Sequence, residues 1–517
     1  MFGFFKAKKT APARDKSQWL HSYTRAIRAK YDSAQTTIEN ERYWAMADGR
    51  SARAALDPSI RERIRQRARY EALESGSFAR GMVAAKVNDV VGRGPTLQVQ
   101  TPNVELNRAI EDAWTAWARE INLPSKLRTM AMAYYVDGES FAERISNPTL
   151  LGEIKLDLRL SEADLWTNPL GTLTMNEVDG IRYDEAGVPV SYERLRMHPG
   201  DDFFDGSISP TETDTIPAEN VIHWFRADRP DQRRGVSHLA TALPLFAELR
   251  RYRLATIAAA EIAADYSAVM YSDASAFSEN PDEVDENFLT IDIERRAMLT
   301  LPAGWKLAQL KAEQPTTQFG SFSEHILMEI GRCLHTPLNI ICGSSREYNF
   351  ASGRLDYLLY WNQNDVDRSD CELVVLERIW RWWLDEALLI SGLIPALGDL
   401  RAINHRFVFP PRRPVDPESQ AATDEKYLAL GLMTDEQWAT REAVDLESHY
   451  EQLARMKEAR EKIGLSMPGA TPAPLMNEDP NAQNQETPSQ PAANDRQPPQ
   501  PAGNNGGGGR RDRGRGR

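Results

Sequence analysis

A helical stretch at residues 237–268 carries alanine on every side of its middle. Residues 255–264 read ATIAAAEIAA, so six of these ten positions have only a methyl side chain. Small side chains let neighbouring helices approach closely. Their spread around the whole helix favours packing against several partners rather than against one core face. We expect the packing positions to include Ala255, Ala258, Ala259 and Ala263.

Apolar residues at helical spacing predict further helices on both sides of this stretch. The predicted helices span residues 104–121, 124–136, 319–335, 353–389, 418–430 and 434–462. Thr434 and Gln437 have the spacing of a capping box at the start of the last helix. Residues 61–80 mix charges of both signs and are interpreted as a solvated helix, whereas residues 399–417 appear irregular.

Strand patterns are concentrated in one block. Residues 96–100 alternate in strand fashion, and residues 139–225 contain short strand-like runs between turn signals such as Asn168-Pro169 and Pro199-Gly200. The sequence therefore predicts an α+β fold, mainly helical, with a small β-rich domain.

The net charge of −13 disfavours tight binding to nucleic acids. Tight nucleic-acid binding calls for clustered Lys and Arg, but an acidic surface still permits DNA to slide past it. No apolar run approaches the roughly 18 residues of a membrane span, so we expect a soluble protein made in the cytoplasm. Three cysteines are interpreted as reduced thiols.

The last residues, 466–517, are rich in Pro, Asn, Gln and Gly and are predicted to be disordered. Five arginines lie among the final eight residues. Two interpretations stay open for them: a flexible arm that touches nucleic acid, or a tail that aids solubility.

No residue pattern predicts a catalytic, cofactor or metal site. Asp201, Asp202 and Asp205 lack the spacing of a calcium loop and are interpreted as a solvated acidic turn. Cys342, with His335 nearby, lacks a recognisable triad and is expected to be a buried thiol. The phosphate-loop pattern and paired-histidine metal motifs are absent from the sequence. We therefore expect a protein that is not an enzyme.

Four segments, in this order, resemble the lambda-type phage portal family. They are residues 68–80 (ARYEALESGSFAR, then Val90-Val91-Gly92), 135–141 (YVDGESF), 221–236 (VIHWFRADRPDQRRGV) and 348–354 (YNFASGR). The third segment is the most specific, and the resemblance covers roughly residues 43–462. Its motif loop supplies these candidate residues: His223, Trp224, Arg229, Pro230, Gln232 and Gly235.

The resemblance implies a ring, usually of twelve subunits, at one vertex of a capsid, with domains called wing, stem, clip and crown. By order along the chain, the expected parts are an N-terminal arm (1–60), a wing (61–236) with the β-rich insert 139–225, a stem helix (237–268), a clip (269–318), a second stem helix (319–335), a tunnel loop with a long wing helix (336–417), a crown (418–465) and the disordered tail (466–517).

The resemblance also implies partners and a location. Double-stranded DNA would pass through the channel without being read, and the tunnel loop would touch its backbone through these residues: Ser344, Ser345, Arg346, Glu347, Tyr348 and Asn349. Terminase, head-completion or adaptor proteins, the major capsid protein and a scaffolding protein are the expected partners. The protein would be found in the virion, and in the host cytoplasm during assembly.

Two alternatives remain open at this level. One is a minor capsid or tail component without a channel. The other, a DNA-packaging nuclease or ATPase, would need the phosphate loop or clustered metal ligands that the sequence lacks.

Overall fold

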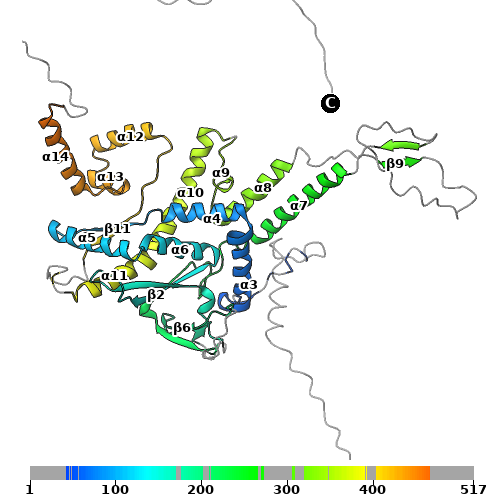
Figure 1. The fold of residues 1–517 in the computed structure, drawn as a ribbon, viewed down its shortest axis with the longest axis horizontal. Coiled ribbons are helices and arrows are strands. Elements are labelled where there is room, and N and C mark those ends of the chain that lie inside the picture. The colour runs from blue at the N-terminus through cyan, green and yellow to red at the C-terminus, as the bar shows by residue number, and fades with distance from the viewer. Residues whose placement is uncertain are drawn as a thin grey trace, which may run out of the picture. The chain divides into compact units, whose positions relative to one another are not determined.

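The structure is a computed structural model that describes most of residues 49–465 (Figure 1). Gaps lie at residues 56, 170–175, 202–208, 210, 266–268, 273–304, 309–318, 347, 391 and 393–402, and residues 42, 44, 45 and 47 are described as well. The chain divides into two units, Met1–Glu447 and Ser448–Arg517. Most of the predicted N-terminal arm and all of the predicted disordered tail lie outside the described residues.

The described part begins with three consecutive helical elements after the short helix α2 (Ala52–Ala55). These are α3 (Pro58–Arg69), the π-helical turn η2 (Tyr70–Ser75) and α4 (Ser77–Val90). Asp57 caps α3 by accepting a hydrogen bond from the backbone N–H of Ser59 at 2.9 Å. Gly92 and Gly94 follow α4 with φ angles of 57° and 96°, conformations that favour glycine and end the helix.

Helices α5 (Val104–Glu120) and α6 (Leu123–Val136) confirm the next two predictions. The buried residues of α5 recur at helical spacing and form one face: Leu106, Ile110, Trp114 and Trp117. This face packs into the largest hydrophobic core of the Met1–Glu447 unit. The 3.6-residue period was therefore a sufficient signal here.

The block at 139–225 is β-rich, as predicted, and consists of two antiparallel sheets. The first has the order β3-β2-β8, built from β2 (Glu139–Ser146), β3 (Leu156–Ser161) and β8 (Val221–Phe225). The second has the order β4-β5-β6-β7, with strands at Glu177–Val178, Ile181–Tyr183, Pro189–Leu195 and Thr213–Pro217. A small second core lies between them, in which Phe141 stacks on Trp166 with ring centroids 4.9 Å apart.

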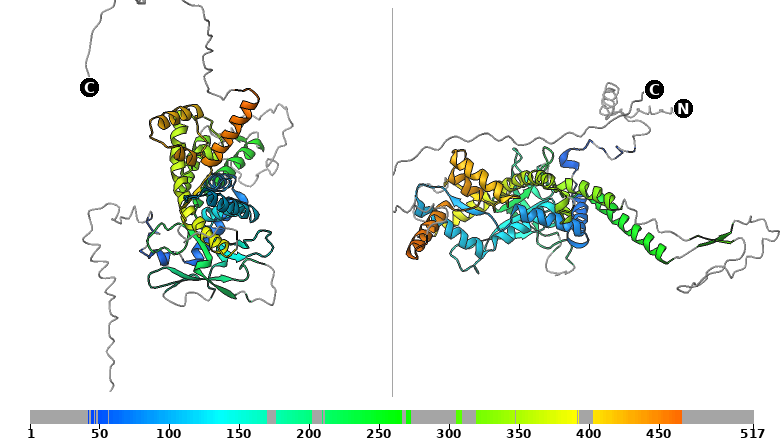
Figure 2. Two further views of the ribbon diagram at one scale, coloured as in Figure 1. Left: turned by 90° about the vertical axis from the view of Figure 1, so that its left-hand side faces the viewer. Right: turned by 90° about the horizontal axis from the view of Figure 1, so that it is seen from above.

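The alanine-rich helix is α7 (Leu243–Asp265), and the prediction that it starts at residue 237 is wrong. Residues 238–242 form turns instead, with the backbone N–H of Ala240 bonded to the carbonyl of Ser237. Helix α8 (Phe319–Gly331) runs back beside α7 (Figures 1 and 2), and Tyr252 contacts Phe322 with ring centroids 4.9 Å apart. Two short strands, β9 (Val269–Ser272) and β10 (Trp305–Ala308), pair antiparallel in the region between these helices.

The long helix predicted at 353–389 is continuous, but it contains a π-helical turn. It consists of α10 (Phe350–Cys371), the π turn η7 (Glu372–Leu376) and α11 (Glu377–Ala387). Trp380 and Trp383 of α11 stack on each other, and both contact Trp114 edge-on at 5.7 and 5.5 Å. Neither this helix nor any other within the described residues is long and apolar enough to cross a membrane.

The prediction that residues 399–417 are irregular is wrong in one place. Residues His405–Val408 form β11, which pairs antiparallel with β1 (Thr96–Val99), so that Leu97 faces Phe407. The two strands are separated by about 300 residues of sequence, and β11 alone is too short to show a clear alternating pattern. The prolines that follow β11 concealed it further.

The helical C-terminal region contains one helix more than predicted. Helix α12 (Pro417–Ala429) agrees with the sequence, and Thr434 with Gln437 forms the predicted capping box. The helix predicted at 434–462 is broken into α13 (Asp435–Arg441) and α14 (Leu446–Lys462). The break contains Ala443 in the left-handed region, with φ 53°, a conformation that alanine seldom adopts.

Candidate functional site

The motif loop after β8 is held in place by its own polar side chains. Gln232 accepts hydrogen bonds from the backbone N–H groups of Asp228 (3.0 Å) and Arg229 (3.3 Å), and it donates to the carbonyl of Arg234 at 3.0 Å. The guanidinium of Arg229 reaches the carbonyl of Arg50 at 3.1 Å. Pro230 is exposed at the turn of the loop.

An ion pair between Arg234 and Glu139 joins the motif loop to β2. Arg234 donates through Nε and Nη2 to the two carboxylate oxygens, each at 2.8 Å, and neither side chain is exposed to solvent. Arg234 also donates to the carbonyl of Trp166 at 2.8 Å, and Glu139 accepts from the backbone N–H of Gly235 at 3.0 Å. The segments at 135–141 and 221–236, which the sequence singled out separately, therefore form one structure.

Two glycines make this contact possible. A Cβ atom on Gly235 would lie 2.1 Å from the carbonyl oxygen of Gly138, and one on Gly138 would lie 2.0 Å from the backbone of Val236. Gly138 also has a φ of 86°, a conformation open mainly to glycine. No other residue fits at either position without moving the backbone.

Three arginines on α3 lie beside the Arg234–Glu139 pair. Together with Arg234 and their carboxylate partners they form a group that we call the arginine cluster. Their burial corrects the prediction that residues 61–80 form a solvated helix. Arg61 and Arg65 are buried, at 2% and 6% exposure. Arg61 pairs with Asp179, and Arg65 donates to Asp164 at 2.7 Å. These arginines recur every four residues, so they lie on one face of α3.

Arg69, the third arginine of that face, pairs in bidentate fashion with Asp137, at 2.7 and 2.8 Å. The segment at 68–80 is thereby tied to the segment at 135–141. Of the functional residues that sequence reasoning missed, the α3 arginines had the clearest signal. Their i, i+4, i+8 spacing is the spacing of a helix face that packs against something.

The cluster fixes the charge states of its members. Burial alone would raise the pKa of Glu139, but Arg234 and the hydrogen bond with His223 hold it well below its usual range. A carboxylate can only accept, so Nε2 of His223 donates across the 3.1 Å to Glu139. Burial lowers the pKa of His223 despite that bond, and it lowers the pKa of Arg61 to about 10.

This arrangement positions chain segments rather than reactive groups. Arg234, Arg65 and Arg61 each have a carboxylate partner. The predicted motif residue Trp224 is fully buried next to the cluster and stacks on Tyr134, with ring centroids 4.4 Å apart. Paired, buried charges of this kind specify one geometry and are costly to break singly.

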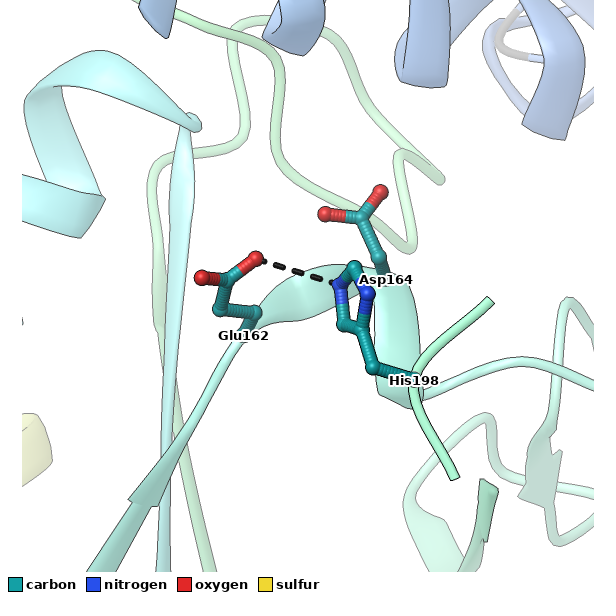
Figure 3. Close-up of side chains that lie close together, drawn as sticks. All are labelled: Glu162, Asp164 and His198. Carbon is teal, nitrogen blue, oxygen red and sulfur yellow. Dashed lines mark ion pairs between the residues drawn. The ribbon is translucent and has the colours of Figure 1, made fainter. Parts of the chain in front are cut away.

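Glu162, Asp164 and His198 bring three potential metal ligands together beside the cluster (Figure 3). His198 Nε2 lies 3.2 Å from Glu162. Arg69, however, already pairs with Glu162 at 3.0 Å and with Asp164 at 2.8 Å. A metal ion would have to displace a guanidinium, so the group is better explained as part of the ion-pair network.

The predicted acidic turn is described only at Asp201, which is exposed; Asp202 and Asp205 lie outside the described residues. Cys342 was expected to be buried, and this is wrong. It is exposed because α9 (Leu338–Cys342) ends there, at the edge of a loop. Cys333 is half-buried and Cys371 is buried.

The predicted tunnel loop connects α9 to α10 and is polar and exposed. Gly343 begins it with a φ of 61°, and Asn349 ends it by capping α10, accepting from the backbone N–H of Ser352 at 2.8 Å. Its exposed side chains include those of Ser344, Ser345 and Arg346. Tyr348 is half-buried, and Glu347 lies outside the described residues.

The predicted packing positions of α7 are accessible in the single chain. Ala255 and Ala258 are exposed and Ala259 is half-buried, while the side chain of Ala263 lies outside the described part. Leu254 and Ile257 on the same stretch are also exposed, at 62% and 53%. An apolar helix surface of this kind is typical of a contact with another molecule.

Comparison with known proteins links these features to a family. The family model described as phage portal protein, lambda family, matches residues 39–368. A probable portal protein of Halomonas phage phiHAP-1 is 25% identical over an alignment of 345 residues that covers 62% of this chain. The chain spans 65% of the length of that curated relative.

Solved structures match this chain at lower sequence identity. The neck of an empty GTA particle, computed with C6 symmetry, has a TM-score of 0.42 at 13% identity and covers 74% of this chain and 94% of its own. An HK97 family phage portal protein from Corynebacterium diphtheriae has a TM-score of 0.31 at 12% identity and covers 68% and 97%. Since the family model spans more than half of the sequence, the chain belongs to the lambda family of phage portal proteins.

Proposed function

We propose that this chain is one subunit of a ring at a capsid vertex, through whose channel double-stranded DNA enters and leaves the head. Membership of the portal family, over residues 39–368, is the observation that carries this proposal. In this role the working part is the bore of the ring. We expect twelve copies, and no catalytic turnover by the chain itself.

The proposal gives each region of the chain a place. The wing would take residues 61–236, the stem 237–268 and 319–335, the clip 269–318 and the crown 418–465. The antiparallel pair of α7 and α8 supports the stem assignment, because the apolar surface of α7 needs a neighbouring subunit to cover it. The arginine cluster would hold the wing rigid beside it.

The loop between α9 and α10 is proposed as the tunnel loop. It offers two serines and Arg346 at its exposed side. Hydroxyl and guanidinium groups bind phosphate oxygens without reading bases. The acidic balance of the whole chain supports a conduit, because a basic lining would hold the phosphates and slow their passage.

The expected partners follow from the same role. Terminase would dock on the clip during packaging, and head-completion or adaptor proteins would replace it afterwards. The major capsid and scaffolding proteins would surround the ring during assembly. The protein would then be a component of the virion, present in the host cytoplasm only while heads are built.

Negative-stain electron microscopy together with mass measurement tests the proposal. Purified protein should give rings with a central hole, and the mass should be a multiple of 58.3 kDa. Solid particles, or a chain that stays monomeric even in the presence of head shells, would contradict it. An ATPase and nuclease assay on the same sample should show no activity.

A further inference from the structure

A groove lies between the first half of α10, the segment after β11, and helices α12 and α13. It has a volume of about 670 Å³, comparable to pockets that bind drug-sized ligands or short peptide segments. All of its lining residues belong to the Met1–Glu447 unit. None of them belongs to the arginine cluster, to the proposed tunnel loop or to α7.

The wall of the groove is built from guanidinium groups stacked on Trp361. The guanidinium carbons of Arg368 and Arg412 lie 5.0 and 5.2 Å from the centre of that ring. Arg368 also donates to the carbonyl of Pro410 at 3.1 Å, and Arg412 pairs with Asp365. These two arginines are therefore committed to holding the wall together.

Two further arginines at the groove are not committed in this way. Arg354 and Arg413 are exposed, and within the described part of the chain their guanidinium groups have no carboxylate partner. The hydroxyl of Tyr357 donates to the carbonyl of Arg413 at 3.2 Å, which fixes the backbone at that rim. Both cations are thus presented on an ordered frame.

The acidic residues of the lining do not compensate for them. Asp365 pairs with Arg412, and Glu442 pairs with Arg441 at 3.0 Å. Asp416 caps α12 by accepting from the backbone N–H of Ser419 at 3.2 Å. In a chain whose net charge is −13, this groove therefore carries an excess of positive charge.

Apolar side chains are exposed beside Arg354 and Arg413. Leu358 and Val415, which both line the groove, are 48% and 46% exposed. Pro414 is exposed between Arg413 and Val415. A ligand that covers this surface must offer anionic groups for the arginines and apolar groups for their neighbours.

We infer that this groove docks an extended acidic segment of another protein, one in which carboxylates alternate with apolar side chains. Arginine binds carboxylates with two parallel hydrogen bonds, and clustered arginines are a recurring device for capturing acidic motifs. A DNA duplex would supply partners for Arg354 and Arg413, but it would leave Leu358 and Val415 in water. The peptide is therefore favoured over nucleic acid.

Selection from a random library of displayed short peptides on the purified full-length protein tests this inference. We expect enrichment of sequences that combine Asp or Glu with apolar residues. Binding of a selected peptide should weaken at least about tenfold in the double variant Arg354→Glu with Arg413→Glu, because complementary charges become repulsive. The variant Leu358→Ser with Val415→Ser should weaken it as well.

The matched control is Arg63→Glu with Arg67→Glu, which makes the same charge change on exposed residues of α3. It should leave peptide binding unchanged. Electron microscopy of each variant reports separately whether rings form, so loss of docking and loss of the proposed channel are distinguishable. No enrichment, enrichment without acidic residues, or equal binding by the Arg354→Glu/Arg413→Glu variant and the Arg63→Glu/Arg67→Glu control would overturn the inference. So would selective binding of a short DNA duplex through Arg354 and Arg413.

Discussion

The carbonyl oxygen of Gly138 lies only 2.1 Å from the position that a Cβ atom on Gly235 would occupy. The substitution Gly235→Ala should therefore push β2 and the motif loop apart. We expect a loss of at least about 2 kcal/mol in the free energy of unfolding, as for other overpacked sites. Urea denaturation followed by circular dichroism measures it.

Gly81→Ala is the matched control for that substitution. Gly81 lies inside α4, and a Cβ atom there would meet nothing within 4 Å. Alanine should raise helix stability at this position by up to about 1 kcal/mol. Equal effects of the two substitutions would show that the close approach of Gly138 and Gly235 is not real.

Removing the charge of Glu139 should destabilise the wing strongly. Glu139→Gln keeps the shape of the side chain but removes the bidentate counter-ion of buried Arg234, which then retains only Asp179. Breaking a buried pair from one side costs about 3 to 5 kcal/mol. Arg196→Gln, which breaks half-exposed pairs with Glu212 and Asp214, should shift the urea midpoint far less. A Glu139→Gln protein with an unchanged urea midpoint would contradict the proposed role of the cluster.

Stability should fall as the pH drops below about 6.5, partly because of His223. Its pKa is lowered in the folded protein, so the unfolded chain takes up a proton that the folded chain refuses. That contribution is complete above the unfolded pKa and is lost toward the folded one. His223→Phe, which retains the stacking on Phe141, should flatten the fall as the pH drops below about 6.5. If the free energy of unfolding falls with pH in the same way for the variant and the parent protein, His223 is not the group responsible.

The proposed tunnel loop can be tested without disturbing its anchors. Residues 345–348 are replaced by a Gly/Ser linker, while Gly343 and the helix cap Asn349 are kept. Packaging of DNA into heads should drop, and rings should still be seen by electron microscopy. A variant that packages normally would exclude this loop from DNA contact.

The exposed face of α7 gives a prediction about assembly. Ala258→Arg adds a bulky cation at an exposed position, so the single chain should keep its helix content, and its free energy of unfolding should change by no more than about 0.5 kcal/mol. Ring formation should be lost, as judged by particle mass. Ala421→Arg, an equally exposed alanine on α12, should assemble normally. Rings of Ala258→Arg would show that α7 does not form the subunit contact.

Local patterns in the sequence predicted local structure well. The apolar spacing of α5 and the turn signals of the β-rich block are encoded within a few neighbouring residues, and both predictions were confirmed. The pairing of β1 with β11 and the contact of Glu139 with Arg234 depend on residues far apart in the chain. No local pattern records such contacts, and the family resemblance marked only the two segments that contain Glu139 and Arg234.

Charge was the least reliable guide. In the sequence, the arginines of α3 have the pattern of exposed residues. Their carboxylate partners, Asp179 and Asp164, lie on other elements, and a single sequence does not reveal them. The helix break at Ala443 was not predicted either, because alanine is a strong helix former and nothing in the sequence indicates its left-handed φ. The predicted loop residues 344–349 were placed on one connection, but their contact with DNA stays a prediction.

The π-helical turn Glu372–Leu376 sets the direction in which the tryptophans of α11 point. A π turn accommodates one residue more than an α-helical turn. If the same residues were wound as an ordinary α-helix, everything after them would be rotated by about 100°, the turn of one residue. Trp380 and Trp383 would then swing away from Trp114. The rotation of α11 about the helix axis, and with it the packing of Trp380 and Trp383 in the main core, therefore depends on the π geometry of this turn.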